Sequence, residues 1–182
     1  MILNRKFVYN VRYIYVMRKI VVGVVALTIL LVTPANAHQP VVLTSADTSA
    51  SKGPLLVDGT VSFAVRASLT KPNQTLAFRA GFKKGDKVEI QYLIVNKKPE
   101  SALKKSDMPV VTIISPTGKR SVMEINERTN FFEPYSKTNF LYLARYLAPA
   151  EKGTYSVVIT SKVPASITIA IGSKEIPGKV TR

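Results

Sequence analysis

Hydrophobic and polar residues alternate along most of the chain in short stretches that begin at turn residues. The clearest stretch, residues 85–92, opens on a Gly-Asp pair and then places Val88, Ile90 and Tyr92 on one side and polar residues on the other. Alternation with a period of two after a turn is typical of a strand with one buried face. Residues 151–160 repeat the pattern. The two stretches predict two sheets around one core.

The same alternation predicts eight or nine short strands, with only a short helix at residues 99–105. The other expected strands span residues 61–66, 76–82, 110–114, 121–125, 140–147 and 167–171. Many short strands separated by turns favour an all-β fold, an antiparallel β-sandwich or jelly roll. We expect its core to contain Val88, Ile90, Val111, Ile113, Tyr155, Val157, Ile167 and Ile169.

The first 37 residues follow a different pattern. Residues 20–32 are an apolar run with a basic pair before it and an Ala-Asn-Ala exit after it. This combination indicates a secretory signal peptide. The run of 13 residues is too short to cross a hydrocarbon core of about 30 Å as a helix. We expect export, cleavage between Ala37 and His38, and no membrane span in the mature chain.

Removal of this leader defines the remaining organisation and charge. We expect an N-terminal edge segment at residues 38–58, the sandwich at 59–175 and a loosely held tail at 176–182. The leader holds five of the 26 basic residues and none of the 11 acidic ones, so residues 38–182 carry a formal charge of +10. Such a surface attracts anionic envelope polymers, and export argues against a nucleic-acid partner. The absence of cysteine excludes disulfides and thiolate chemistry.

The order of the turn motifs resembles a known family. Phe78 and Phe82 precede the Gly-Asp turn, Ser-Pro-x-Gly follows at residues 115–118, and Gly-Thr-Tyr at 153–155 leads into the closing strands. Across residues 60–172 this order is similar to the bacterial pre-peptidase C-terminal domain, although the acidic turn residues expected after the middle hairpin are sparse. That family is a small β-sandwich accessory module. The resemblance implies binding or folding assistance rather than catalysis.

Residues 127–138 are the longest break in the strand pattern of the second half. We expect an irregular loop that meets a ligand, because binding residues concentrate in loops on rigid scaffolds. The candidate ligand-binding residues are Arg128, Asn130, Phe131, Phe132 and Tyr135. The expected partner is an envelope polysaccharide, another anionic polymer or a protein. The alternative is that Phe131 and Phe132 fold back over the core as a lid.

His38 is the single histidine of the chain. Cleavage after Ala37 would make it the first residue, so that its free amine and its imidazole could chelate Cu(II) together. The periplasmic copper-resistance proteins begin in a similar way but use a further histidine. In this chain only Asp47 or Asp58 is expected to complete such a site.

Catalytic chemistry has few candidates. A Ser-His-Asp mechanism needs a histidine held within the fold, which the expected position of His38 does not provide. Carboxylate pairs, Glu124 with Glu127 or Glu127 with Glu133, leave a hydrolase of envelope polymers as an alternative, although such spacings are common on solvated surfaces. We therefore expect a non-catalytic exported binding or accessory protein, with copper binding and polymer hydrolysis as the alternatives.

Overall fold

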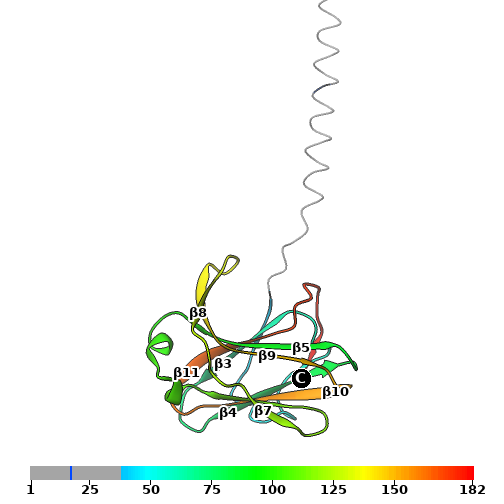
Figure 1. Ribbon diagram of the computed structural model, residues 1–182, viewed down its shortest axis with the longest axis horizontal. Coiled ribbons are helices and arrows are strands. Elements are labelled where there is room, and N and C mark those ends of the chain that lie inside the picture. The colour runs from blue at the N-terminus through cyan, green and yellow to red at the C-terminus, as the bar shows by residue number, and fades with distance from the viewer. Residues whose placement is uncertain (1–16, 18–37) are drawn as a thin grey trace, which may run out of the picture. The chain divides into compact units, whose positions relative to one another are not determined.

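Two six-stranded sheets form the two layers of a β-sandwich (Figure 1). The computed structural model describes residue 17 and residues 38–182, so the rest of the predicted leader, including Ala37 before the expected cleavage point, lies outside the described residues. The first sheet has the order β1 (Gln39–Val42), β3 (Phe63–Leu69), β11 (Ala165–Ile171), β5 (Lys87–Val95), β9 (Thr138–Pro149) and β8 (Thr129–Glu133). The second has the order β12 (Val180–Thr181), β2 (Leu55–Leu56), β4 (Thr75–Phe82), β10 (Gly153–Thr160), β6 (Val110–Ile114) and β7 (Arg120–Val122).

The predicted all-β sandwich is confirmed. Most neighbouring strands are antiparallel, and two parallel pairs, β1 with β3 and β2 with β4, make both sheets mixed. The predicted helix at 99–105 is instead two short 3₁₀ turns, η1 (Glu100–Ala102) and η2 (Lys105–Asp107). Within the described residues, no helix has the length and apolar character needed to span a membrane.

The core lies between the two sheets and is built by the alternation that the sequence displays. The eight core residues expected from the sequence are all at most 3% exposed. Tyr92 is also fully buried, and its hydroxyl donates to the carbonyl of Pro109 at 3.0 Å. Burial raises the pKa of Tyr92 well above its usual value, so this hydroxyl remains a donor. The Tyr92 bond ties β5 to the start of β6 across the core.

The two turns that open β5 and β10 lie together at one end of the sandwich. The amide of Gly85 donates to the carbonyl of Ala150 at 2.9 Å, and the amide of Ala150 donates to the carbonyl of Asp86 at 2.7 Å. Gly85 has a φ of 84°, a left-handed conformation that favours glycine. The prediction that the repeated turn-and-strand pattern belongs to two sheets is confirmed, since β5 and β10 lie in different layers.

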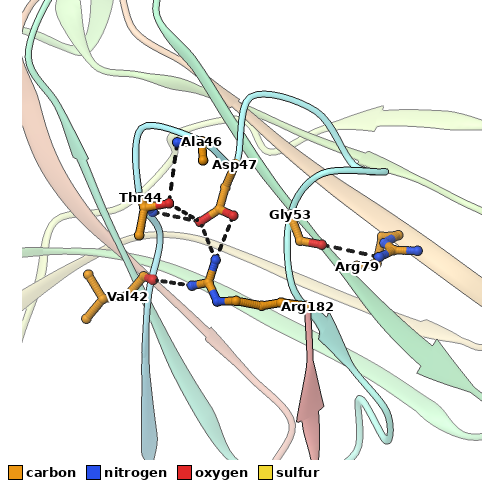
Figure 2. Close-up of polar contacts among 7 residues, drawn as sticks. All are labelled: Val42, Thr44, Ala46, Asp47, Gly53, Arg79 and Arg182. Atoms are coloured by element: carbon orange, nitrogen blue, oxygen red, sulfur yellow. Dashed lines mark hydrogen bonds and ion pairs between the residues drawn. The ribbon is translucent and has the colours of Figure 1, made fainter.

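The tail is held in place, and the expectation of a loose tail was wrong. β12 pairs with β2, and the Arg182 guanidinium donates to Asp47 Oδ1 at 2.7 Å and to Oδ2 at 3.0 Å (Figure 2). A second nitrogen of Arg182 donates to the carbonyl of Val42 at 2.9 Å. Thr44 approaches the same carboxylate through its amide and its hydroxyl (Figure 2). The tail therefore adds the edge strand of the second sheet and holds the loop that contains Thr44 and Asp47.

Candidate ligand-binding site

The segment expected as an irregular loop, residues 127–138, instead forms the strand β8, a turn at 134–137 and the start of β9, so that expectation was wrong. β8 pairs with β9 in antiparallel register, with Phe131 opposite Phe140, and the hairpin projects from the sandwich (Figure 1). Its tip is held by Glu133, whose carboxylate accepts from the amide of Tyr135 at 2.9 Å and from the amide of Ser136 at 2.6 Å. The tip is therefore an ordered turn.

A cleft of about 150 Å³ lies between this hairpin and the outer face of the first sheet. We call it the outer-face cleft. One side is an aromatic wall formed by Phe131, Tyr135, Phe140 and Tyr142. The floor consists of small, aliphatic and uncharged polar side chains from β3, β5 and β11, namely Ala64, Gln91, Leu93, Thr168 and Ala170. The remaining lining residues are His38, Pro40, Arg66, Glu133 and Ser136.

A β-bulge arranges the aromatic wall. The register of β5 and β9 shifts between Tyr92 and Leu93, so that Tyr142 lies opposite Leu93 and Arg145 lies opposite Gln91. Residues three apart in a regular strand point to opposite faces, and the extra residue in β9 brings Tyr142 and Arg145 to the same face. The bulge therefore places a cation beside the aromatic wall.

Tyr142 is the centre of a stack on this face. Its ring centroid lies 5.3 Å from that of Phe131, with the planes inclined by 42°, and the guanidinium carbon of Arg145 lies 3.9 Å from the Tyr142 ring centroid. Arg145 Nε donates to Glu127 Oε1 at 2.8 Å, and this bond is the main cause of a lowered pKa at Glu127. Burial raises the pKa of Tyr142 despite the opposing charge of Arg145. The stack fixes the wall before any ligand arrives.

Two charged side chains of the cleft, Glu133 and Arg66, differ in their hydrogen bonding. Burial acts to raise the pKa of Glu133, but hydrogen bonds from Ser136 and Tyr135 and the charge of His38 outweigh it, so the pKa is lowered and the carboxylate is ionised at neutral pH. Arg66 lines the cleft and is exposed. Within residues 38–182, its guanidinium makes no hydrogen bond or ion pair.

The five candidate ligand-binding residues do not all line one cleft. Phe131 and Tyr135 line the outer-face cleft, whereas the other three do not. Arg128 donates to the carbonyls of Ser101 at 3.0 Å and Leu103 at 2.6 Å, which holds the loop after β5. Asn130 accepts from the side chain of Asn96 at 2.9 Å, and Phe132, on the opposite face of β8 from Phe131, is 54% exposed. Phe132 therefore does not fold back over the core, as the lid alternative requires.

Several cleft residues were missed by the sequence reasoning, above all Arg66 and Tyr142. Both belong to expected strands, at residues 61–66 and 140–147, but the sequence analysis drew its candidate ligand-binding residues only from the segment between strands. The small pair Ala64 and Ala170 could have been noticed, because two small residues on one outer face leave room for a ligand.

His38 lines the cleft, but the partners expected for a copper site do not join it. Asp47 is bound to Arg182 and Thr44, and Asp58 accepts from the amide of Thr60 at 2.9 Å and from its hydroxyl at 2.6 Å. In the part of the chain that the structure describes, no group of three or more His, Cys, Asp or Glu side chains is placed to hold a metal ion. The acidic residue that shares the cleft with His38 is Glu133.

The carboxylate pairs are held by different donors. Glu127 accepts from Arg145 and from the Thr129 hydroxyl, while Glu133 binds backbone amides of the hairpin tip. Glu124 is exposed, and neither Glu124 nor Glu127 lines the cleft. Of the three, only Glu133 faces the place where a ligand would lie.

Comparison with known proteins gives similarity of structure only. No model of a protein family matches the sequence, and no curated protein sequence matches it. The pre-peptidase C-terminal domain of a collagenase from Bacillus anthracis is similar with a TM-score of 0.39 and 9% identity, over 78% of this chain and 99% of that one. It is the module that the turn motifs resemble, and the predicted resemblance is confirmed at this level.

Two further solved structures are similar at the same modest level. A periplasmic inhibitor of g-type lysozyme from Aeromonas hydrophila has a TM-score of 0.32 and 11% identity, over 75% of this chain and 99% of that one. A family GH115 4-O-methyl-α-glucuronidase with specificity for decorated arabinogalactans has a TM-score of 0.36 and 18% identity, over 60% of this chain. This chain spans 14% of the length of that enzyme.

Proposed function

We propose that this protein is an exported, non-catalytic binding module whose outer-face cleft takes one sugar ring of an envelope polysaccharide. The observation that carries the proposal is the aromatic wall set above a floor of small and uncharged polar side chains. Sugar rings have apolar faces that pack on aromatic rings and a periphery of hydroxyls that form hydrogen bonds. In the cleft, Phe131 and Tyr142 supply the first kind of contact, and Gln91 and Thr168 supply the second.

The size of the cleft supports a single ring rather than a larger ligand. Pockets for drug-sized ligands usually enclose about 300–1,000 Å³, whereas this one measures about 150 Å³. One ring of a polymer can enter a shallow cleft of this size while the rest of the polymer remains outside. Side chains fixed by the Phe131–Tyr142–Arg145 stack reduce the entropy lost on binding.

The state of the carboxylates supports binding rather than hydrolysis. Glycosidases need one carboxyl group with a raised pKa to act as the acid. The pKa values of Glu127 and Glu133 are both lowered, which favours the ionised form at each position. Hydrogen bonds to backbone amides give Glu133 a role in holding the hairpin tip.

Phe131→Ala is expected to weaken saccharide binding at least 10-fold, because it removes an aromatic surface worth about 1.4 kcal/mol or more. Phe132→Ala is the matched control. It truncates the same side chain one residue later, on the other face of β8, and should change the affinity less than about twofold. Calorimetric titration with purified neutral and acidic tetrasaccharides measures both. Equal affinities for the two folded variants would place the site elsewhere, and no saccharide binding by the wild type would refute the proposal.

Copper binding is a second candidate, favoured by the presence of His38 and Glu133 in one cleft. If cleavage leaves His38 first, its amine and imidazole supply two nitrogen ligands, and the Glu133 carboxylate could supply an oxygen. A chain starting at His38 should then bind Cu(II), His38→Ala should abolish tight binding, and Glu133→Gln should weaken it. Cu(II) titration followed by visible absorption checks this. Unchanged binding by His38→Ala would exclude the site.

A further inference from the structure

We infer that the outer-face cleft selects an acidic sugar, a uronic acid residue, and that Arg66 binds its carboxylate. This inference rests on the proposed saccharide binding and adds the charge and the anchoring residue of the ligand. It starts from the position of Arg66. The residue lies on β3 opposite Thr168 on β11, and both side chains line the cleft.

Arg66 is placed across the cleft floor from the aromatic wall. In the first sheet, β11 and β5 separate β3 from β9, which carries Tyr142. Leu93 on β5 pairs with both Thr168 and Tyr142, so Arg66, Thr168, Leu93 and Tyr142 form one row across the sheet. A ring packed on Tyr142 would cover Leu93 and direct one edge toward Arg66. A uronic acid carries its carboxylate at such an edge.

The charge of Arg66 is available to a ligand. Its guanidinium forms no ion pair with any of the residues from 38 to 182. Glu133 is the one acidic side chain among the lining residues, and its two oxygens already accept amide hydrogen bonds of 2.9 Å and 2.6 Å. By contrast, the neighbouring Arg145 is bound to Glu127. Of the two arginines on this face, Arg66 is the one without a carboxylate.

The chemistry of the guanidinium fits a carboxylate better than a hydroxyl. Arginine presents parallel N–H groups that match the two oxygens of a carboxylate, and such charge-assisted pairs are stronger than neutral hydrogen bonds. The formal charge of +10 on residues 38–182 adds a long-range attraction for a polyanion. An acidic peptide shares this attraction, but its carboxylates sit on flexible aliphatic stems and offer no ring to the aromatic wall.

The test compares ligands that share the sugar ring but differ in the charge of its carboxyl group. Wild-type protein is titrated with tetramers of galacturonate, glucuronate and mannuronate and with their methyl esters, which keep the ring and remove the charge. We expect at least one free acid to bind 10-fold or more tightly than its ester. Arg66→Gln should remove that preference, because it should lower the affinity for the acid at least 10-fold and leave the affinity for the ester unchanged within about twofold. Arg120→Gln, an exposed arginine on β7 in the other sheet, is the control and should behave as wild type.

The outcomes separate this inference from the proposed function. Equal affinity for acids and esters, or an Arg66→Gln variant that keeps the preference, would overturn the role of Arg66 while saccharide binding stands. Failure of every tetramer to bind would overturn both. Tighter binding of hexaglutamate than of any uronate would mean that the ligand is an acidic peptide and not a sugar. Because acid binding depends on an ion pair, its affinity should also fall as salt is raised, whereas ester binding should not.

Discussion

Phe78→Ala is expected to lower the free energy of unfolding by about 3–5 kcal/mol, the range for phenylalanine truncated in a packed core. Phe78 is 0% exposed and lies in β4, between β2 and β10 of the second sheet. Both neighbouring strands hold it in place, so the surrounding side chains have little freedom to collapse into the space that the ring leaves. A loss of this size is a large fraction of the stability of a typical domain.

The matched control is Phe132→Ala, which removes the same atoms from a side chain that is 54% exposed. We expect it to change the free energy of unfolding by about 0.5 kcal/mol or less. Urea titration followed by far-UV circular dichroism measures both variants, since the chain has no tryptophan. Equal losses for Phe78→Ala and Phe132→Ala would contradict the placement of Phe78 between the sheets.

The core of this protein was predictable because alternation reports burial directly. Val88, Ile90 and Tyr92 are spaced by two and all point inward from β5. A strand with one solvent-exposed face must keep this pattern, because a shift of its register by one residue would expose every apolar side chain. The fold class followed from the number of such strands and the turns between them.

The shortest strands carry no such signal. β2 and β12 have two residues each, which is too few to show a period. Their position depends on contacts between residues far apart in the sequence, such as the ion pair of Asp47 with Arg182. A polar tail therefore resembles a free tail in the sequence, even though the fold provides a partner for it.

The hairpin at residues 127–138 was misjudged for a related reason. β8 is an edge strand, and Asn130 and Phe132 on one of its faces are both exposed, so hydrophobic and polar positions do not alternate. Its two aromatic neighbours, Phe131 and Phe132, point to opposite sides, and only Phe131 reaches the cleft. The sequence indicated this segment as a candidate site but not which side of it faces the cleft.

The cleft residues outside the hairpin could not be inferred from local sequence. Arg66 and Tyr142 are brought to one face by the strand order and by the bulge in β9, and neither is visible in a pattern of single residues. Outer-face residues of a sandwich are ordinarily solvated, so their use as a site depends on what covers them. Here the hairpin provides that cover.

Asp47→Ala is expected to lower the free energy of unfolding by about 2–3 kcal/mol, because it removes charge-assisted hydrogen bonds to a buried carboxylate. The Asp47 side chain is 2% exposed and accepts from Thr44 and from Arg182, which is 49% exposed. Arg182→Met should lower the free energy of unfolding less, by about 1 kcal/mol, because water screens the charge of the exposed Arg182 side chain. Glu124→Ala, which truncates an exposed carboxylate, should change stability by less than about 0.5 kcal/mol.

The Arg182 contribution should also depend on pH. Burial acts to raise the pKa of Asp47, but the hydrogen bonds from Thr44 and Arg182 and the charge of Arg182 outweigh it, so the folded-state pKa is lowered. A group with a lowered folded pKa contributes stability that is complete above its unfolded pKa of about 3.9 and is lost as pH falls through the folded value. Wild type should therefore exceed Arg182→Met in urea midpoint at pH 7, and the difference should shrink below about pH 4. A difference that stays constant down to pH 2 would mean that Arg182 stabilises the tail by packing and not through the carboxylate of Asp47.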